Sequence, residues 1–195
     1  GPRLSPSAVI YRHIPNLISV FRLLLVPPVI ALILAGRHQA ALGLVLVAGL
    51  SDALDGFLAK RYGWTSELGS ILDPLADKLL VVSAVLALLA IGLLPLWLAA
   101  LVVARDLVIV IGALSYRYFI GSFRIAPSLI SKLNTGVLIL LILAVIAGEI
   151  LDRSMALEPL LLLCGCTVIA SGVDYVIRWG LKARRELAAG RAARH

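Results

Sequence analysis

Charged residues are scarce in this chain, and most of the sequence is apolar. Only 15% of the 195 residues are charged, whereas 61% are hydrophobic. A soluble domain usually carries about 25% charged residues, so this chain has too few polar side chains to cover itself in water. The composition argues against a soluble enzyme, a disordered tail and a coiled coil, and it indicates an integral membrane protein.

Cysteine and histidine are few and do not cluster. Cys164 and Cys166 lie one residue apart in an apolar stretch. They predict no disulfide framework, and we interpret them as small packing residues. His13, His38 and His195 are widely separated in the sequence and predict no metal site.

Six apolar stretches make up most of the chain. A membrane-spanning helix needs roughly 20 mostly apolar residues. Stretches of this length cover residues 14–34, 39–60, 68–91, 96–119, 129–149 and 158–181. The hinges between them leave no room for a soluble domain. Because backbone polar groups in lipid must be satisfied within the structure, we predict an all-α bundle of six transmembrane helices, which forms one domain over residues 1–195.

The two ends of the chain differ from the apolar stretches. We interpret Gly1 and Pro2 as the scar of a cleaved tag. Residues 4–13 are mildly amphipathic and predict a short helix in the membrane interface. Residues 182–195 are basic and predict a cytoplasmic tail. The start of the chain does not resemble a transit peptide, which favours a bacterial inner membrane over a mitochondrial one.

Positive charge exceeds negative charge, with 18 Lys and Arg against 11 Asp and Glu and a formal net charge of +7. In a soluble protein this balance would suggest a nucleic acid partner. Here the basic residues lie between apolar stretches, so we expect contact with anionic lipid headgroups and no nucleic acid. In the six-helix arrangement most of them fall on one side, which predicts that both termini and the active site face the cytoplasm.

Four aspartates interrupt the apolar stretches. Each ionisable group inside a membrane helix costs about 2.5–3.5 kcal/mol on insertion scales, which marks it as a functional candidate. Asp52 and Asp55 are three residues apart near the end of the second stretch, and Asp73 and Asp77 are four apart near the start of the third. These spacings place each pair on one helix face. We expect the two helices to pack as an antiparallel pair.

The residues around the aspartates indicate what the site binds. Four neighbouring carboxylates would repel one another, and divalent cations remove that repulsion. Oxygen ligands suit Mg²⁺, Mn²⁺ or Ca²⁺. Gly56, Ala59 and Gly69 leave space for a bulky ligand, and Lys60 and Lys78 suggest that it is anionic. Phosphate chemistry follows from this combination. The alternative is that the aspartates cap helix ends and pair with neighbouring cations.

These residues resemble the signature of the CDP-alcohol phosphotransferase family, D-x2-D-G-x2-A-R-x8-G-x3-D-x3-D. With every spacing kept, its positions are occupied by Asp52, Asp55, Gly56, Ala59, Lys60, Gly69, Asp73 and Asp77. One position departs, because Lys60 stands where the family has Arg, and a lysine is a point charge rather than a fork. The six-helix layout is also similar to that of the family.

The resemblance implies a role for each signature residue. The four aspartates would hold two metal ions, Mg²⁺ or Mn²⁺, and Asp77 would also act as the general base. The CDP-linked donor would contact residues of the first stretch and of the signature: Asn16, Ser19, Arg22, Asp52, Gly56, Ala59, Lys60, Gly69 and Asp73. For the first stretch, the alternatives are that Asn16 caps a helix and that Arg22 snorkels to the interface. The resemblance also implies a homodimer.

Further polar residues in the second half of the chain are candidates for the acceptor site. Arg105 lies in the middle of a predicted span, where an uncompensated arginine is costly, and Asp106 is its expected partner or support. The resemblance implies that Arg105, Lys132, Asn134 and, with weaker support, Arg117 contact the acceptor. Asp174 and Arg178 lie four residues apart, and we interpret them as a structural ion pair.

The choice of acceptor depends on residues 127–135, which are similar to the CMP-forming cardiolipin synthases of this family. Phosphatidylglycerophosphate synthases typically carry a second lysine where Asn134 stands. Their acceptor, glycerol 3-phosphate, has a charge near −2, whereas phosphatidylglycerol has a single negative charge and needs fewer cations. The resemblance therefore implies transfer from CDP-diacylglycerol to phosphatidylglycerol, with glycerol 3-phosphate as the alternative acceptor. An ion or metal transporter is a further alternative, but transporters distribute carboxylates through the membrane depth, often in two matching halves.

Overall fold

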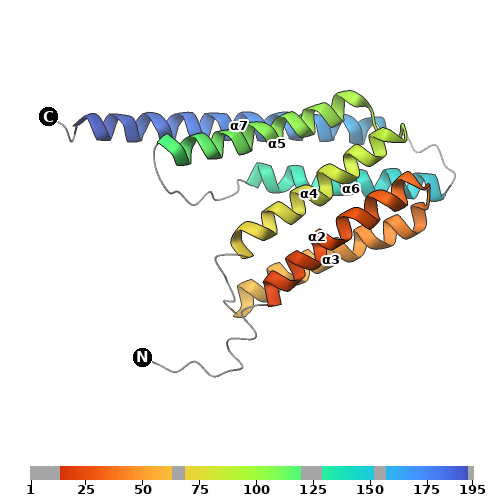
Figure 1. Cartoon of the computed structure of the whole chain (residues 1–195). Coiled ribbons are helices and arrows are strands. Elements are labelled where there is room, and N and C mark those ends of the chain that lie inside the picture. Colours follow the sequence, from red (N-terminus) through yellow and green to blue (C-terminus); the bar gives the residue numbers. More distant parts are fainter. Residues whose placement is uncertain (1–13, 63–68, 120–128, 152–156, 193–195) are drawn as a thin grey trace, which may run out of the picture. The chain divides into compact units, whose positions relative to one another are not determined.

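The computed structural model describes residues 14–62, 69–119, 129–151 and 157–192, and the surroundings of side chains within 17–51, 76–112, 129–151 and 157–181. This part of the chain is helical and contains no strand (Figure 1). Its helices are α2 (Ile14–Leu34), α3 (His38–Tyr62), α4 (Gly69–Ala90), α5 (Leu96–Phe119), α6 (Leu129–Ile150) and α7 (Glu158–Ala192). The predicted interfacial helix over residues 4–13 lies outside the described residues.

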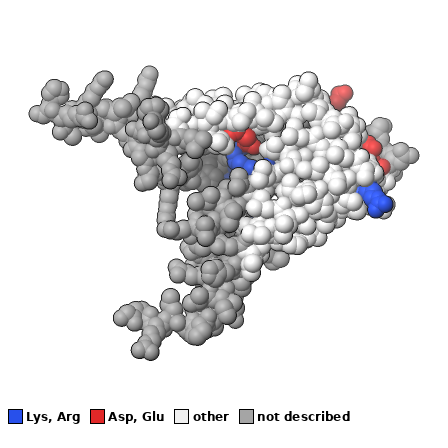
Figure 2. Space-filling model, in the orientation of Figure 1, with Lys and Arg blue, Asp and Glu red and all other residues white. Residues whose placement is uncertain are grey.

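Three of these helices are long and apolar enough to cross a membrane. The segments are Leu17–Leu34, Leu129–Ile150 and Glu158–Leu181. Figure 2 shows one face of the molecule, on which charged residues are few among those described. The prediction of an all-α membrane protein is confirmed at this level, and the number of six transmembrane helices stays a prediction.

The helix bounds agree closely with the apolar stretches, with one difference at the C-terminus. Helix α7 does not end with its apolar stretch at residue 181 but continues through the basic segment to Ala192, for 35 residues in all. Ala, Leu, Arg, Lys and Glu, which fill residues 181–189, are good helix formers. The change in polarity therefore marks where the apolar surface ends and not where the helix ends.

The chain divides into two compact units. The first comprises Gly1–Leu94 and Ile142–Met155, and the second comprises Pro95–Leu141 and Ala156–His195. In the first unit, α2 packs against both α3 and α4 (Figure 1). Buried residues recur every three or four positions along these helices, as packed helix faces require: Leu25, Val29 and Ile33 on α2, Ala41, Val45 and Ala48 on α3, and Ala76, Leu80, Ala84 and Leu88 on α4.

Glycines in the left-handed conformation end α2 and α4. Gly36 has a φ of 68° and Gly92 a φ of 79°. After α2, the N–H of Arg37 donates to the carbonyl of Leu32 at 2.9 Å, and that of Gly36 donates to Ile33 at 3.0 Å. This Schellman pattern satisfies carbonyls at the helix end, and it reverses the chain within a few residues.

In the second unit, α5 packs against α7. Leu98 and Val102 of α5 and Cys164 and Val168 of α7 are buried in its core. The two helices approach closely at Gly165, where an added Cβ would lie 2.8 Å from Cζ3 of Trp97. The interpretation of Cys164 as a packing residue is therefore confirmed.

The close approach of α5 to α7 predicts that a side chain at Gly165 destabilises the protein. A Gly165→Ala change should lower the free energy of unfolding by about 1–2 kcal/mol, because the indole of Trp97 must move to admit the methyl group. The Trp97 side chain is 44% exposed, so it has room to move. Thermal unfolding in detergent measures the change. Gly180→Ala on the same helix is the matched control, since nothing lies within 4 Å of its added Cβ. Equal stability of the two variants would contradict the close approach.

Candidate functional site

The signature residues lie on the helices that the sequence predicts for them. Asp52 and Asp55 fall in the C-terminal part of α3, and Asp73 falls in the N-terminal part of α4. Figure 1 shows these two helix ends at the same end of the first unit, together with the start of α2. Helical backbone at these positions confirms the spacings on which the shared helix faces depend. The side chains of these three aspartates lie outside the described part, and so do those of Asn16, Gly56, Ala59, Lys60 and Gly69.

Asp77 is the signature residue whose surroundings are described, and it forms an ion pair. Nη1 of Arg22, on α2, donates to Oδ1 of Asp77, on α4. The Arg22 side chain is 1% exposed and that of Asp77 is 35% exposed. Ser19, one helical turn before Arg22, is also buried. The ion pair thus connects the buried polar residues of α2, Ser19 and Arg22, to the last residue of the signature, on α4.

The burial of Arg22 distinguishes between the two interpretations of this residue. A snorkelling arginine would extend its guanidinium to the interface, but this guanidinium is enclosed and directed at a carboxylate on another helix. Arg22 therefore lies beside a predicted catalytic residue. Its contact with the donor nucleotide stays a prediction.

The donor set of the signature fits a divalent metal. All four candidate ligands are carboxylates, which match the preference of Mg²⁺ and Mn²⁺ for oxygen. Asp77 is one-third exposed although its partner is buried. Among the residues whose surroundings are described, no three His, Cys, Asp or Glu side chains lie together. The surroundings of Asp52, Asp55 and Asp73 are outside this set. Their role as ligands stays a prediction.

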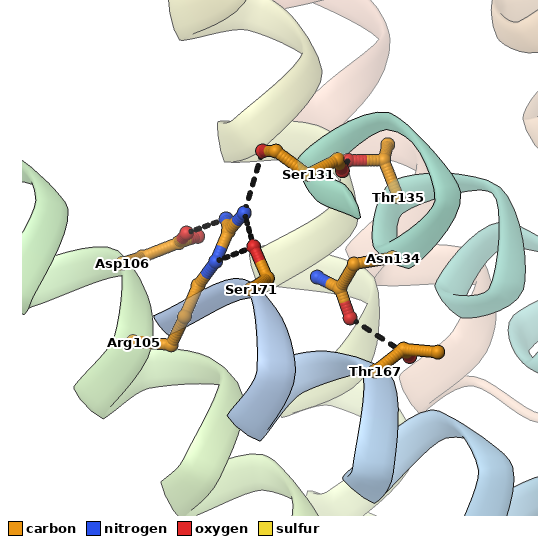
Figure 3. A network of polar contacts seen from close by, with 7 residues as sticks. All are labelled: Arg105, Asp106, Ser131, Asn134, Thr135, Thr167 and Ser171. Carbon is orange, nitrogen blue, oxygen red and sulfur yellow. Dashed lines mark hydrogen bonds and ion pairs between the residues drawn. The ribbon is translucent and has the colours of Figure 1, made fainter. Parts of the chain in front are cut away.

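A second polar cluster lies in the second unit and is centred on Arg105 of α5. Its side chain is almost buried, with 9% of the residue exposed. Nε and Nη2 both donate to Oγ of Ser171 on α7, at 3.2 Å and 2.6 Å. Nη2 also donates to Oγ of Ser131 on α6 at 2.7 Å, and Nη1 donates to Asp106 at 2.6 Å (Figure 3). One side chain thus connects α5 to both α6 and α7, and the prediction that Asp106 is its partner is confirmed.

Asn134 is buried on the same helix as Ser131 and faces α7. The hydroxyl of Thr167 lies 3.1 Å from Oδ1 of Asn134 and 2.9 Å from the carbonyl of Cys164 (Figure 3). Because a hydroxyl carries a single proton, it donates to one of these acceptors at a time. Asn134 is therefore hydrogen-bonded to α7, and its contact with the acceptor stays a prediction.

The remaining candidates differ in their surroundings. Lys132 follows Ser131 on α6 and is exposed. Arg117 lies near the end of α5, and its side chain is outside the described part. Asp174 and Arg178 form the expected ion pair at 2.7 Å, with the Arg178 side chain 62% exposed.

Sequence reasoning did not single out Ser171 or Thr167. Both lie in an apolar stretch in which small hydroxyl side chains are common. A signal is nevertheless present, because Ser171 continues the buried face of Cys164 and Val168 at helical spacing. A hydroxyl group on a buried helix face needs a partner.

The ion pair of Arg22 and Asp77 is expected to contribute to the free energy of unfolding. Asp77→Asn should lower the free energy of unfolding by about 1–3 kcal/mol, less than the 3–5 kcal/mol typical of a fully buried pair, because Asp77 is partly exposed. Adding Arg22→Met should recover part of the loss, since no buried charge then remains. Thermal unfolding with a chelator present measures both. Asp174→Asn, whose partner is exposed, should cost under about 1 kcal/mol. Equal losses for the two Asp→Asn variants would contradict the buried pair.

Comparison with known proteins assigns the chain to a family. Residues 12–171 match the family model of CDP-alcohol phosphatidyltransferases. A Schizosaccharomyces pombe protein named as a fusion of cardiolipin synthase (CMP-forming) and a mitochondrial hydrolase is 37% identical, over 84% of this chain and 30% of its own length. Human cardiolipin synthase (CMP-forming) is 32% identical, over 90% of this chain and 64% of its own length.

A rice chloroplastic CDP-diacylglycerol–glycerol-3-phosphate 3-phosphatidyltransferase is 33% identical, over 87% of this chain and 57% of its own length. The chain thus spans less than two thirds of the length of these relatives.

Dependence on a divalent metal is general in the matching family, which agrees with the carboxylate donor set. From the signature on α3 and α4 and the match over most of its length, the chain belongs to the CDP-alcohol phosphatidyltransferase family.

Proposed function

We propose that this chain transfers a phosphatidyl group from CDP-diacylglycerol to a hydroxyl group of phosphatidylglycerol, which gives cardiolipin and CMP. The observation that carries the proposal is the family signature, with every spacing kept and Lys60 in place of its arginine, on two helix ends of one unit, where its last residue, Asp77, is paired with Arg22. The relatives from Schizosaccharomyces pombe and human, both named CMP-forming cardiolipin synthases, support this acceptor.

Asp77 is the proposed general base. The acceptor hydroxyl gives its proton to the Asp77 carboxylate and attacks the β-phosphorus of CDP-diacylglycerol. A new phosphorus–oxygen bond forms, and the bond from this phosphorus to the oxygen of CMP breaks. Arg22 donates to Oδ1 of Asp77, and in this role it orients the carboxylate for this step. Asn16 and Ser19, on the same helix as Arg22, contact the nucleotide.

The four aspartates are proposed to hold two divalent ions, Mg²⁺ or Mn²⁺. Bound there, the ions would supply positive charge for the diphosphate of the donor. Gly56, Ala59 and Gly69 provide space for the cytidine, and Lys60 pairs with its phosphates. We propose a homodimer of six-helix subunits in a bacterial inner membrane, and the distribution of basic residues supports a site on the cytoplasmic side.

The charges of the second unit support a singly charged acceptor. Arg105 is neutralised by its ion pair with Asp106. Lys132 is exposed, and it makes no ion pair within the described part of the chain. Among the described residues of this unit, Lys132 is the cation that makes no ion pair, and one such cation suits the phosphodiester of phosphatidylglycerol better than the phosphomonoester of glycerol 3-phosphate. The rice relative, named for glycerol 3-phosphate, supports the second candidate acceptor.

The acceptor is tested by CMP release from CDP-diacylglycerol and Mg²⁺ or Mn²⁺, with each acceptor offered separately to the purified protein. We expect release with phosphatidylglycerol, and a loss of about 10²–10⁴-fold in Asp77→Asn, the range that a general base contributes. Asp174→Asn, a matched acid-to-amide change at the exposed ion pair, should keep wild-type activity. Release with glycerol 3-phosphate alone would reject the proposed acceptor and leave the family's donor in place.

Nucleotide binding separates the enzyme from a transporter. CDP and CMP should raise the thermal unfolding midpoint of the protein when Mg²⁺ or Mn²⁺ is present and should have little effect with a chelator, because a ligand that binds only the folded state stabilises it. Stabilisation at 100 times the dissociation constant would amount to about 2.7 kcal/mol. A midpoint that does not respond to CDP with either metal would contradict a nucleotide site and would favour an ion pathway.

A further inference from the structure

Helix α2 contains two consecutive prolines in its interior. Pro27 and Pro28 lie within the helix and do not end it. A proline has no N–H group, so the carbonyls of Leu23 and Leu24 cannot accept the usual hydrogen bond from four residues ahead, and the proline rings crowd these carbonyls. Prolines are a common cause of sharp bends in helices. The backbone of α2 is therefore weakest at this level.

The missing hydrogen bonds lie on the outer side of α2. Leu24 is 69% exposed, and Pro27 is exposed as well. This side of the helix faces away from the apolar core of the first unit, in which α2 packs against α3 and α4. A change in the bend at the prolines can therefore open or close the outer side of the helix without breaking the core.

The two halves of α2 are anchored by different kinds of contact. After the prolines, the buried side chains are apolar, and Val29 and Ile33 are only 1% and 0% exposed. Before the prolines, two of the three buried side chains in the described part are polar, namely Ser19 and Arg22. Arg22 donates to Asp77 of α4. Dense apolar packing holds one arrangement, whereas an ion pair can be released and formed again.

We propose that Pro27 and Pro28 form a hinge, about which residues 14–26 move as a lid. In the closed position, Arg22 contacts Asp77, as the structure shows. In the open position this contact is broken, while the half of α2 after the prolines stays packed. The ligand of the lid rests on the proposed function: the predicted contacts of α2 with the donor lie on the moving half, so the lid would close over a nucleoside diphosphate. Such lids gate binding and release.

Distances between spin labels test the hinge without any ligand. The labels are placed on a chain in which both native cysteines are replaced by alanine. One pair, at Leu17 and Leu86, joins the lid to α4, and these residues are 66% and 44% exposed. The control pair, at Leu34 and Leu79, joins the other half of α2 to the same helix, and these residues are 51% and 42% exposed. Leu17 lies ten residues before Pro27. This is about 15 Å along the helix, so a rotation of about 20° moves it by about 5 Å.

Breaking the contact between Arg22 and Asp77 should move the lid alone. In Asp77→Ala we expect the lid distance to change by about 5 Å and the control distance to stay as in the wild type. In Pro27→Ala/Pro28→Ala, which restores two N–H donors, the same aspartate change should no longer move the lid. This double variant should keep or raise the thermal midpoint, because proline is the poorest helix former. A shift of both label pairs together, or of neither, would overturn the hinge.

The kinetics of nucleotide binding test whether the hinge serves the donor site. With Mg²⁺ present, a fluorescent CDP analogue should bind to Pro27→Ala/Pro28→Ala and dissociate from it about tenfold more slowly than in the wild type, because a lid gates both steps. The Kd should therefore change little. Pro159→Ala is the matched control and should alter neither rate, since Pro159 lies in the first turn of α7, where a missing N–H breaks no helical hydrogen bond. Faster dissociation alone would indicate a merely structural role and overturn the lid.

The outcomes also separate this inference from the proposed function. A wild type that does not bind the CDP analogue with Mg²⁺ or Mn²⁺ overturns both the nucleotide site and the lid over it, whereas the spin-label distances still decide the hinge. If the analogue binds to the wild type and the double proline variant changes neither rate, the lid is wrong and the nucleotide site stands.

Discussion

Compensation of buried charge is the constraint that shapes both polar regions of this protein. A charged group in an apolar interior is costly unless it is paired and hydrogen-bonded, and two arginines are almost fully enclosed here. Arg22 is paired with a carboxylate on another helix, whereas Arg105 combines its neighbour Asp106 with hydroxyl groups from two other helices. In each case the side chain that carries the charge also ties helices together.

The charges of Arg22 and Arg105 are compensated in different ways, and the two arrangements have different structural consequences. Arg22 and Asp77 are far apart in the sequence, so their pair fixes α2 against α4 at the end of the unit that carries the signature. The pair of Arg105 and Asp106 needs no second helix, and the serines of α6 and α7 accept three further hydrogen bonds from the guanidinium. A carboxylate that already faces an arginine is held in one orientation. An arginine that donates to two other helices holds those helices at one level.

Most of the helical architecture could be predicted from hydropathy alone. The bounds of α2 and α5 coincide with the apolar stretches at 14–34 and 96–119, and Gly36, with its positive φ, ends α2 where the apolar run ends. Helix α7 runs past its stretch and through Gly180, because the basic residues that follow are themselves helix formers. Hydropathy reports where a helix meets water, whereas propensity and capping decide where it ends.

The candidate site could be predicted in part. Spacing along one helix is fixed by the backbone, so the positions of the aspartates on α3 and α4 followed from the sequence. The partner of Asp77 could not be predicted, since it depends on how α2 and α4 are rotated about their axes, and no pattern within either helix specifies this rotation. The same holds for Ser171, whose contact with Arg105 requires α5 and α7 to meet at one level. Asp106 could be predicted because it is adjacent in sequence.

Net charge connects these contacts to the choice of ligands. Four carboxylates of the signature and the diphosphate of a CDP-linked donor carry negative charge alike, and Arg22 is already engaged with one of the carboxylates. A donor of this kind, as proposed, would need added cations to balance this charge, and carboxylate oxygens are the ligands that Mg²⁺ and Mn²⁺ prefer. In the second unit the buried guanidinium of Arg105 is likewise paired with a carboxylate, that of Asp106. In the first unit compensation favours divalent cations beside the carboxylates of the signature, because a single arginine cannot balance four of them.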